Sequence, residues 1–192
     1  QDDIHLLQNP PRQLIDEQIK LSRLLDAPAP AQFYVVRGET AEAVLQREEA
    51  LKQRLEPLIE KKIISGYQAM SNWAPSLRTQ ETHRQLIEQR LLNNDGALAV
   101  LAARIGADGS WITATRGRLL ASAEKLTPDD FLKASASQLV RHLWLGQVEG
   151  GHASIVGLRG VSAASLPSLR QAGGALEGVQ WVDKVGEISS VL

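Results

Sequence analysis

The strongest constraint on the fold is a strand, a long helix and a second strand that follow one another between residues 33 and 73. Residues 33–36 (Phe-Tyr-Val-Val) favour a buried strand that ends at Gly38. Residues 39–62 predict a helix, which Pro57 is expected to kink or to divide. Its apolar face is formed by Ala41, Val44, Leu51, Leu55, Leu58 and Ile59. Residues 67–73 predict the second strand, ended by Pro75, and this order of elements is typical of a βαβ unit.

The C-terminal third predicts a second set of strands around one helix. Residues 143–148 and 153–158 are apolar runs, and Glu149-Gly150-Gly151 between them indicates a hairpin. A short helix over 162–172 and a strand over 179–182 follow. The two ends together predict an α+β fold, with a mostly antiparallel sheet backed by helices on one face. A ferredoxin-like split βαβ arrangement is its best concrete form, with residues 33–36 close to 153–158 or 179–182.

These patterns divide the chain into four segments of one compact domain. Residues 1–31 form an N-terminal helix and linker, and 32–75 form the first βαβ half. Residues 76–137 form a helical insertion, and 138–192 form the second ββαβ half. Within the insertion, two helical patterns meet near residues 93–96, and residues 111–115 predict a short strand. Thr127 and Pro128 then predict the start of another helix.

Composition excludes several classes of protein. The 192 residues hold 21 basic and 22 acidic side chains, so no positive excess is available to bind nucleic acid. The absence of cysteine rules out disulfides, thiolate metal sites and cysteine nucleophiles. The longest apolar run, residues 97–103, is far shorter than the ~20 residues that cross a bilayer.

A search for catalytic motifs finds one arrangement to weigh. The chain has no phosphate-binding loop and no dinucleotide fingerprint, and its four histidines are scattered, so we expect neither a metal nor a cofactor. His152 and Ser154 lie two residues apart on a predicted strand and share a face, as a base and a nucleophile would. No strained elbow surrounds the serine and the sequence marks no acidic partner, so a polar hairpin face is favoured over a serine hydrolase.

Four tryptophans lie on or beside predicted strands, where they are either core residues or walls of an apolar groove. Trp73 stands at the entrance of the insertion and Trp111 within it. If the insertion packs against the sheet, a groove forms between them, and these two side chains are the candidates for substrate contact.

Four stretches resemble a known family of membrane transporters. They are residues 2–8 (DDIHLLQ), 33–38 (FYVVRG) leading into 45–49 (LQREE), 66–69 (GYQA) and 180–188 (QWVDKVGEI). Together they resemble the first large periplasmic loop of a predicted exporter of the resistance-nodulation-division (RND) superfamily, in its MMPL-like branch. The nearest subgroup is encoded with aryl-polyene or xanthomonadin pigment genes in Gram-negative bacteria. The resemblance covers both ends of the chain well and the helical middle poorly.

The resemblance implies a porter subdomain built from βαβ units, placed between the first and second transmembrane helices of a larger inner-membrane protein. Such a protein exports lipid-like or polyene molecules, driven by protons that carboxylates of its transmembrane helices relay. Those helices are not in this chain, so no catalytic or proton-carrying residue is transferred to it, and an enzyme is not expected. The implied partners are an amphiphilic substrate and the second periplasmic loop and transmembrane helices of the same parent; a homo-oligomer is left open. The alternatives are a free-standing periplasmic binding or adaptor domain, and the serine hydrolase.

Overall fold

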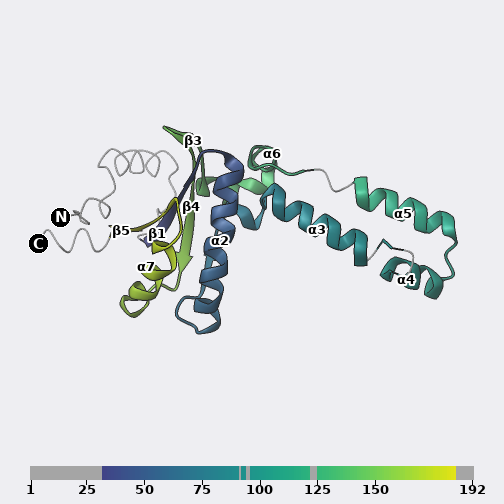
Figure 1. The fold of residues 1–192 in the computed structure, drawn as a ribbon, viewed down its shortest axis with the longest axis horizontal. Helices are drawn as coiled ribbons and strands as arrows, with labels where there is room; N and C mark the ends of the chain where they lie inside the picture. Colours follow the sequence, from purple (N-terminus) through teal and green to yellow (C-terminus); the bar gives the residue numbers. More distant parts are fainter. Residues whose placement is uncertain (1–31, 91, 94–95, 122–124, 185–192) are drawn as a thin grey trace, which may run out of the picture.

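The computed structural model describes residues 32–90, 92–93, 96–121 and 125–184, which form an α+β fold (Figure 1). Six α-helices and a five-stranded antiparallel sheet lie within these residues. The strands are β1 (Gln32–Gly38), β2 (Gly66–Gln68), β3 (Trp144–Val148), β4 (Gly151–Arg159) and β5 (Val179–Asp183). Four of them follow the order β2-β4-β1-β5, and β3 pairs with the part of β4 that β2 leaves free.

Two crossover connections each span an intervening strand. β1 and β2 are both antiparallel to β4, so they run parallel to each other with β4 between them, and α2 (Ala41–Glu60) joins them. Likewise β4 and β5 flank β1 and are joined through α7 (Leu166–Gly174). Phe33 faces Gly157 on one side and Val182 on the other. The prediction that both ends of the chain meet in one sheet is therefore confirmed.

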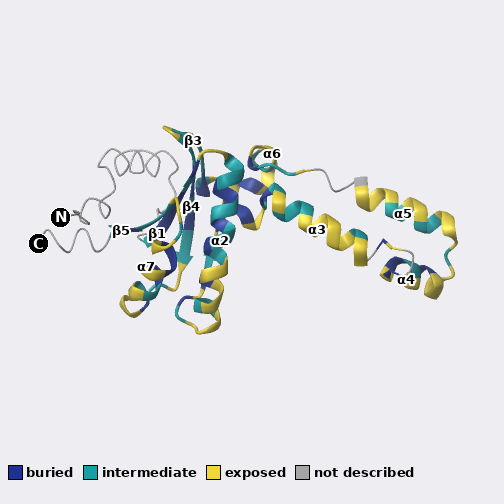
Figure 2. Ribbon diagram, in the orientation of Figure 1, coloured by how far each residue is buried: buried dark blue, intermediate teal, exposed yellow. Residues whose placement is uncertain are grey.

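The larger core lies between the sheet and helices α2 and α7 (Figure 2). The hydroxyl of Tyr34 on β1 donates to the carbonyl of Leu169 on α7 at 2.6 Å, and its ring meets Trp181 edge-on. These contacts join β1, β5 and α7. On the opposite face, Phe33, Val35 and Val182 form a smaller buried cluster.

The middle of the chain forms an arm that projects from the sheet (Figure 1). We use "the arm" for α3 (Leu77–Arg90), α4 (Ala97–Ile105) and α5 (Gly109–Ala121). The chain then returns through residues 125–127 and α6 (Pro128–Lys133), and Leu126, Phe131 and Leu132 of this segment pack against the core. The insertion was expected to pack against the sheet; among its described residues, Leu126, Phe131 and Leu132 pack against the core beside the sheet.

Two predicted strands differ from the structure. Residues 111–115 lie inside α5, because the Asp108 carboxylate accepts from the Trp111 amide and the Ser110 hydroxyl at the start of that helix. The expected strand over 67–73 is short, since β2 ends at Gln68 and a 3₁₀ turn over Met70–Asn72 replaces the rest.

The long helix expected after the first strand is present as α2, one element that includes Pro57 in its last turn. Of the two effects expected of Pro57, a kink or a division, the division is wrong. Thr127 accepts from the Asp130 amide at 3.2 Å and caps α6, as predicted. The helix expected within residues 1–31 lies outside the described residues.

The β3–β4 hairpin turns at Gly150, whose φ of 82° lies in the left-handed region. We expect Gly150→Val to lower the free energy of unfolding by roughly 1–3 kcal/mol. The cost is backbone strain, because a Cβ at this position would meet no atom within 4 Å. Thermal melts measure it, with Gly109→Val as a control that has equally open surroundings without the positive φ. An unchanged midpoint for Gly150→Val contradicts the assignment.

Candidate functional site

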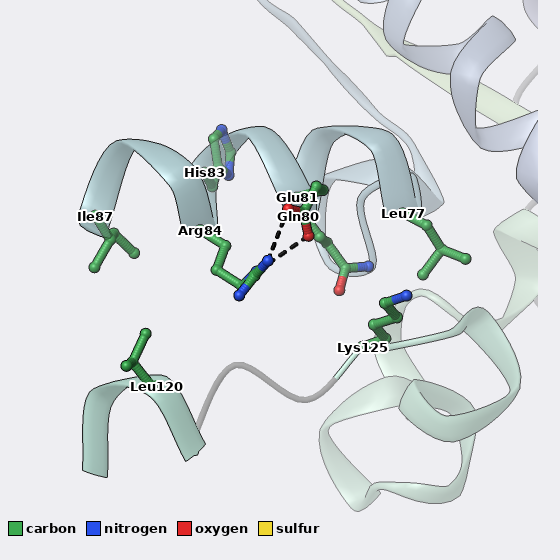
Figure 3. A pocket seen from close by; sticks show the side chains of 8 residues that line it. All are labelled: Leu77, Gln80, Glu81, His83, Arg84, Ile87, Leu120 and Lys125. Atoms are coloured by element: carbon green, nitrogen blue, oxygen red, sulfur yellow. Dashed lines mark hydrogen bonds and ion pairs between the residues drawn. The ribbon is translucent and has the colours of Figure 1, made fainter. Parts of the chain in front are cut away.

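A hollow lies in the arm, between α3 and the returning chain (Figure 3). It is a groove of about 480 Å³. Its wall is formed by Leu77, Gln80, Glu81, His83, Arg84 and Ile87 of α3, Leu120 of α5, and Lys125. Most of the α3 residues recur every three or four positions, so one helical face supplies one wall of the groove.

Gln80 holds the two walls together. Its amide group donates to the carbonyls of Pro75 and Leu126, each at 2.7 Å. Its amide oxygen accepts from the Leu126 backbone N–H at 2.9 Å. This side chain therefore pairs with the backbone of the returning segment at Leu126, and it fixes Lys125 opposite α3.

The polar wall is charged and largely exposed. Arg84 donates to both carboxylate oxygens of Glu81, at 2.9 and 3.1 Å, and also to Glu88 at 2.9 Å. Hydrogen bonds from Arg84 and Gln85, together with the nearby Lys125, hold the pKa of Glu81 below its usual range. The charge of Lys125 therefore already acts on the Glu81 carboxylate, across the groove from it.

The groove is apolar at one end and mixed at the other, where Lys125 lies near Leu77 and its charge acts on Glu81. Figure 3 places Ile87 and Leu120 together at one end, and Leu77 and Lys125 at the other, with Arg84 between. An elongated molecule with an anionic head and an apolar tail matches this polarity. Burial of such a tail would gain about 25 cal/mol for each Å² removed from water.

Two carboxylates of α2 anchor the arm. Glu49 accepts from the Ser76 amide, the Ser76 hydroxyl and the Thr79 hydroxyl at 2.7–2.8 Å. Glu42 accepts from the Leu77 amide at 2.8 Å and the Arg78 amide at 3.3 Å. Both anions therefore satisfy free N–H groups at the positive end of the α3 dipole.

A third carboxylate of α2, Glu48, is fully buried in the core. It accepts from the Ser154 hydroxyl at 2.5 Å and from the Ser71 amide at 2.7 Å. Burial raises the pKa of Glu48, although these hydrogen bonds and the charge of Lys52 act in the opposite direction. Glu48 thus ties α2 to β4 and to the segment that leads into the arm.

The hydrogen bond between Ser154 and Glu48 also bears on His152 and Ser154, the pair considered as base and nucleophile of a hydrolase. Ser154 is fully buried and its hydroxyl donates to Glu48, an acidic partner that the sequence did not mark. His152 is half-buried, and its Nδ1 has no hydrogen-bond partner within the described part of the chain. In this geometry Ser154 is part of a structural contact between β4 and α2.

The two tryptophans chosen as substrate contacts lie at different places. Trp73 follows the 3₁₀ turn at the base of the arm, is 51% exposed, and stacks on Phe131 with ring centroids 6.0 Å apart. Trp111 is half-buried in the first turn of α5, at the end of the arm far from the sheet (Figure 1). The groove residues include neither, and substrate contact by Trp73 and Trp111 stays a prediction.

Three further observations bear on function. Within the described ranges, no cluster of three or more His, Asp or Glu side chains could hold a metal ion. In the same ranges, no helix combines the length and the apolar character needed to span a membrane. Comparisons of the chain with known protein families, curated proteins and solved structures find no match.

Proposed function

We propose that this chain is a periplasmic porter domain of a proton-driven, RND/MMPL-type exporter of lipid-like or polyene substrates. The observation that carries the proposal is the pair of split crossovers, β1-α2-β2 and β4-α7-β5, in one sheet of order β2-β4-β1-β5. This connectivity supports a ferredoxin-like unit, the form expected of porter subdomains from the resemblance of both chain ends.

The arm supports the proposal through its chemistry. It lies between the two halves of the ferredoxin-like unit, where the insertion was predicted. Its groove presents Ile87 and Leu120 at one end, and Leu77 with Lys125 at the other, which suits an amphiphile better than a polar metabolite. In the proposed transporter, this groove receives the substrate, and the energy for export comes from membrane helices outside this chain.

Variants of the groove test this function. We expect the chain to bind a fluorescent long-chain fatty acid, and Ile87→Asn with Leu120→Asn to weaken that binding about tenfold, because two apolar walls become polar. Lys125→Gln should weaken it less and should remove its dependence on salt. Fluorescence titration measures the dissociation constants.

Leu139→Asn is the matched control, since Leu139 is 84% exposed and lies outside the groove. Trp73→Phe and Trp111→Phe test the earlier assignment, because a loss of affinity in either variant supports a tryptophan contact. If all the groove variants bind the fatty acid with the affinity of the wild type, a substrate site in the arm is contradicted. The transporter hypothesis predicts that the gene encodes transmembrane segments of ~20 apolar residues on both sides of this chain. Their absence would favour the alternative of a free-standing binding or adaptor domain.

A further inference from the structure

Helix α4 carries apolar side chains on two neighbouring faces. Leu98 and Ala102 on one face are buried. Val100, Leu101 and Ile105, on what we call the outer side, are 53%, 49% and 58% exposed. A helix that is apolar all round is normally covered on every side, so the outer side of α4 lacks a partner among the described residues.

The exposed residues form one continuous stripe. Positions 97, 100, 101, 104 and 105 recur at intervals of three and four, and all five are exposed. Four are apolar, and the fifth is Arg104. A contiguous apolar surface of this kind marks an interaction site.

Charge indicates what the stripe contacts. Residues 96–121, which we call the arm tip, hold three arginines (Arg104, Arg116 and Arg118) and one acidic residue, Asp108, whereas the whole chain has a net charge of −1. A second copy of this face would bring Arg104 against the like charges of its partner. An anionic surface instead pairs with Arg104 on the stripe, since a planar guanidinium group binds phosphate oxygens in two-point contacts.

The shape of the arm tip favours a lipid surface as that anionic partner. The stripe lies on a helix that projects from the body of the molecule (Figure 1). Short apolar side chains flanked by arginine penetrate the boundary between headgroups and acyl chains, while the long arginine side chains reach the phosphates. We propose that the arm tip inserts the α4 stripe into the headgroup layer of a bilayer rich in anionic phospholipid. This contact is separate from the groove and does not depend on the transport function.

A single fluorescent label tests the proposal directly. The chain contains no cysteine, so Ile105→Cys can carry one environment-sensitive dye on the stripe, and Gln53→Cys one on the exposed side of α2. With vesicles of phosphatidylglycerol and phosphatidylcholine in equal parts, we expect a blue shift for the dye at 105 and none for the dye at 53. Pure phosphatidylcholine vesicles should give little shift, and added salt should reverse the shift on anionic vesicles.

Flotation of the unlabelled chain with the same vesicles provides the second readout. Leu101→Asn with Ile105→Asn should weaken binding by about tenfold, and Arg104→Gln by about fivefold. Leu139→Asn should bind as the wild type does. Absence of binding to anionic vesicles, or equal binding by the stripe variants, overturns the proposal. Sedimentation tests the alternative that the stripe binds a second copy of this chain. Concentration-dependent dimers that the stripe variants abolish, together with absence of vesicle binding, would overturn the membrane proposal in favour of that dimer.

Discussion

Glu48→Ala is expected to lower the free energy of unfolding by roughly 3–5 kcal/mol, the largest effect of any polar substitution proposed for this chain. The side chain is fully buried, and its loss leaves the Ser154 hydroxyl and the Ser71 amide without their acceptor. It also leaves a cavity between α2 and β4. Urea unfolding followed by circular dichroism measures the change.

Glu48→Gln separates the charge of this group from its shape. The glutamine oxygen can accept from the Ser71 amide, and its NH₂ group can donate to the Ser154 oxygen, so we expect a loss of only about 1–2 kcal/mol. A loss equal to that of Glu48→Ala would contradict this account of the two hydrogen bonds.

The same pair of variants predicts a pH dependence. Because the pKa of Glu48 is raised in the folded state, that state holds the proton more tightly than the unfolded chain does. The stability that Glu48 contributes is fully present below its ordinary pKa of about 4.3 and is lost as pH rises through the folded pKa. Wild type should therefore lose stability across this window relative to Glu48→Gln. Parallel profiles for the two proteins would show that Glu48 does not titrate as proposed.

The sheet and its connections were largely predictable because they depend on local patterns. The β-favouring run at 33–36, the glycines at 150 and 151 and the run at 179–182 all lie in strands or turns as expected. Residues 111–115 misled the prediction because tryptophan, isoleucine and threonine favour strands. The Asp108 cap overrides that preference in an exposed helix.

The groove and the buried carboxylate were less accessible to sequence reasoning. Leu77 and Leu120 are 43 positions apart in the chain, and only the path of the arm brings them to one groove. Glu48 did leave a signal, since it stands between Val44 and Leu51 at the spacing of the apolar face of α2. A charged residue at such a position predicts a buried partner, and that partner came from a strand more than 100 residues away.

The double variant Glu42→Ala/Glu49→Ala removes both carboxylates that anchor the arm. We expect it to speed hydrogen exchange of the Ser76, Leu77 and Arg78 amides roughly ten- to hundredfold. Each factor of ten corresponds to a decrease of ~1.4 kcal/mol in the free energy of local opening. The three amides donate to these two carboxylates, and two further hydrogen bonds come from the hydroxyls of Ser76 and Thr79. Amides of β1 and β4 should exchange as in wild type, because their ladder does not involve the arm. Hydrogen exchange resolved by NMR or mass spectrometry measures both regions in one experiment.

Low pH should weaken the attachment of the arm to α2 in part, as the double variant does. Although partial burial acts to raise it, hydrogen bonds from Gln46 and from the Leu77 and Arg78 amides lower the pKa of Glu42 overall. A carboxylate with a lowered pKa contributes stability above its ordinary pKa and loses it as pH falls through the folded value. The amides of Leu77 and Arg78 should therefore lose protection in acid, after correction for the intrinsic exchange rate, whereas Glu48 favours the folded core under the same conditions.

Glu60→Ala is the matched control, since Glu60 is an exposed carboxylate on the same helix. Unchanged exchange at residues 76–78 in the double variant would show that Gln80 and the packing of Leu126 hold the arm without the carboxylates. Faster exchange in β1 and β4 as well would show that the variant unfolds the whole domain. Release confined to the arm would establish that α2 holds it through Glu42 and Glu49, while the same helix joins the sheet through Glu48.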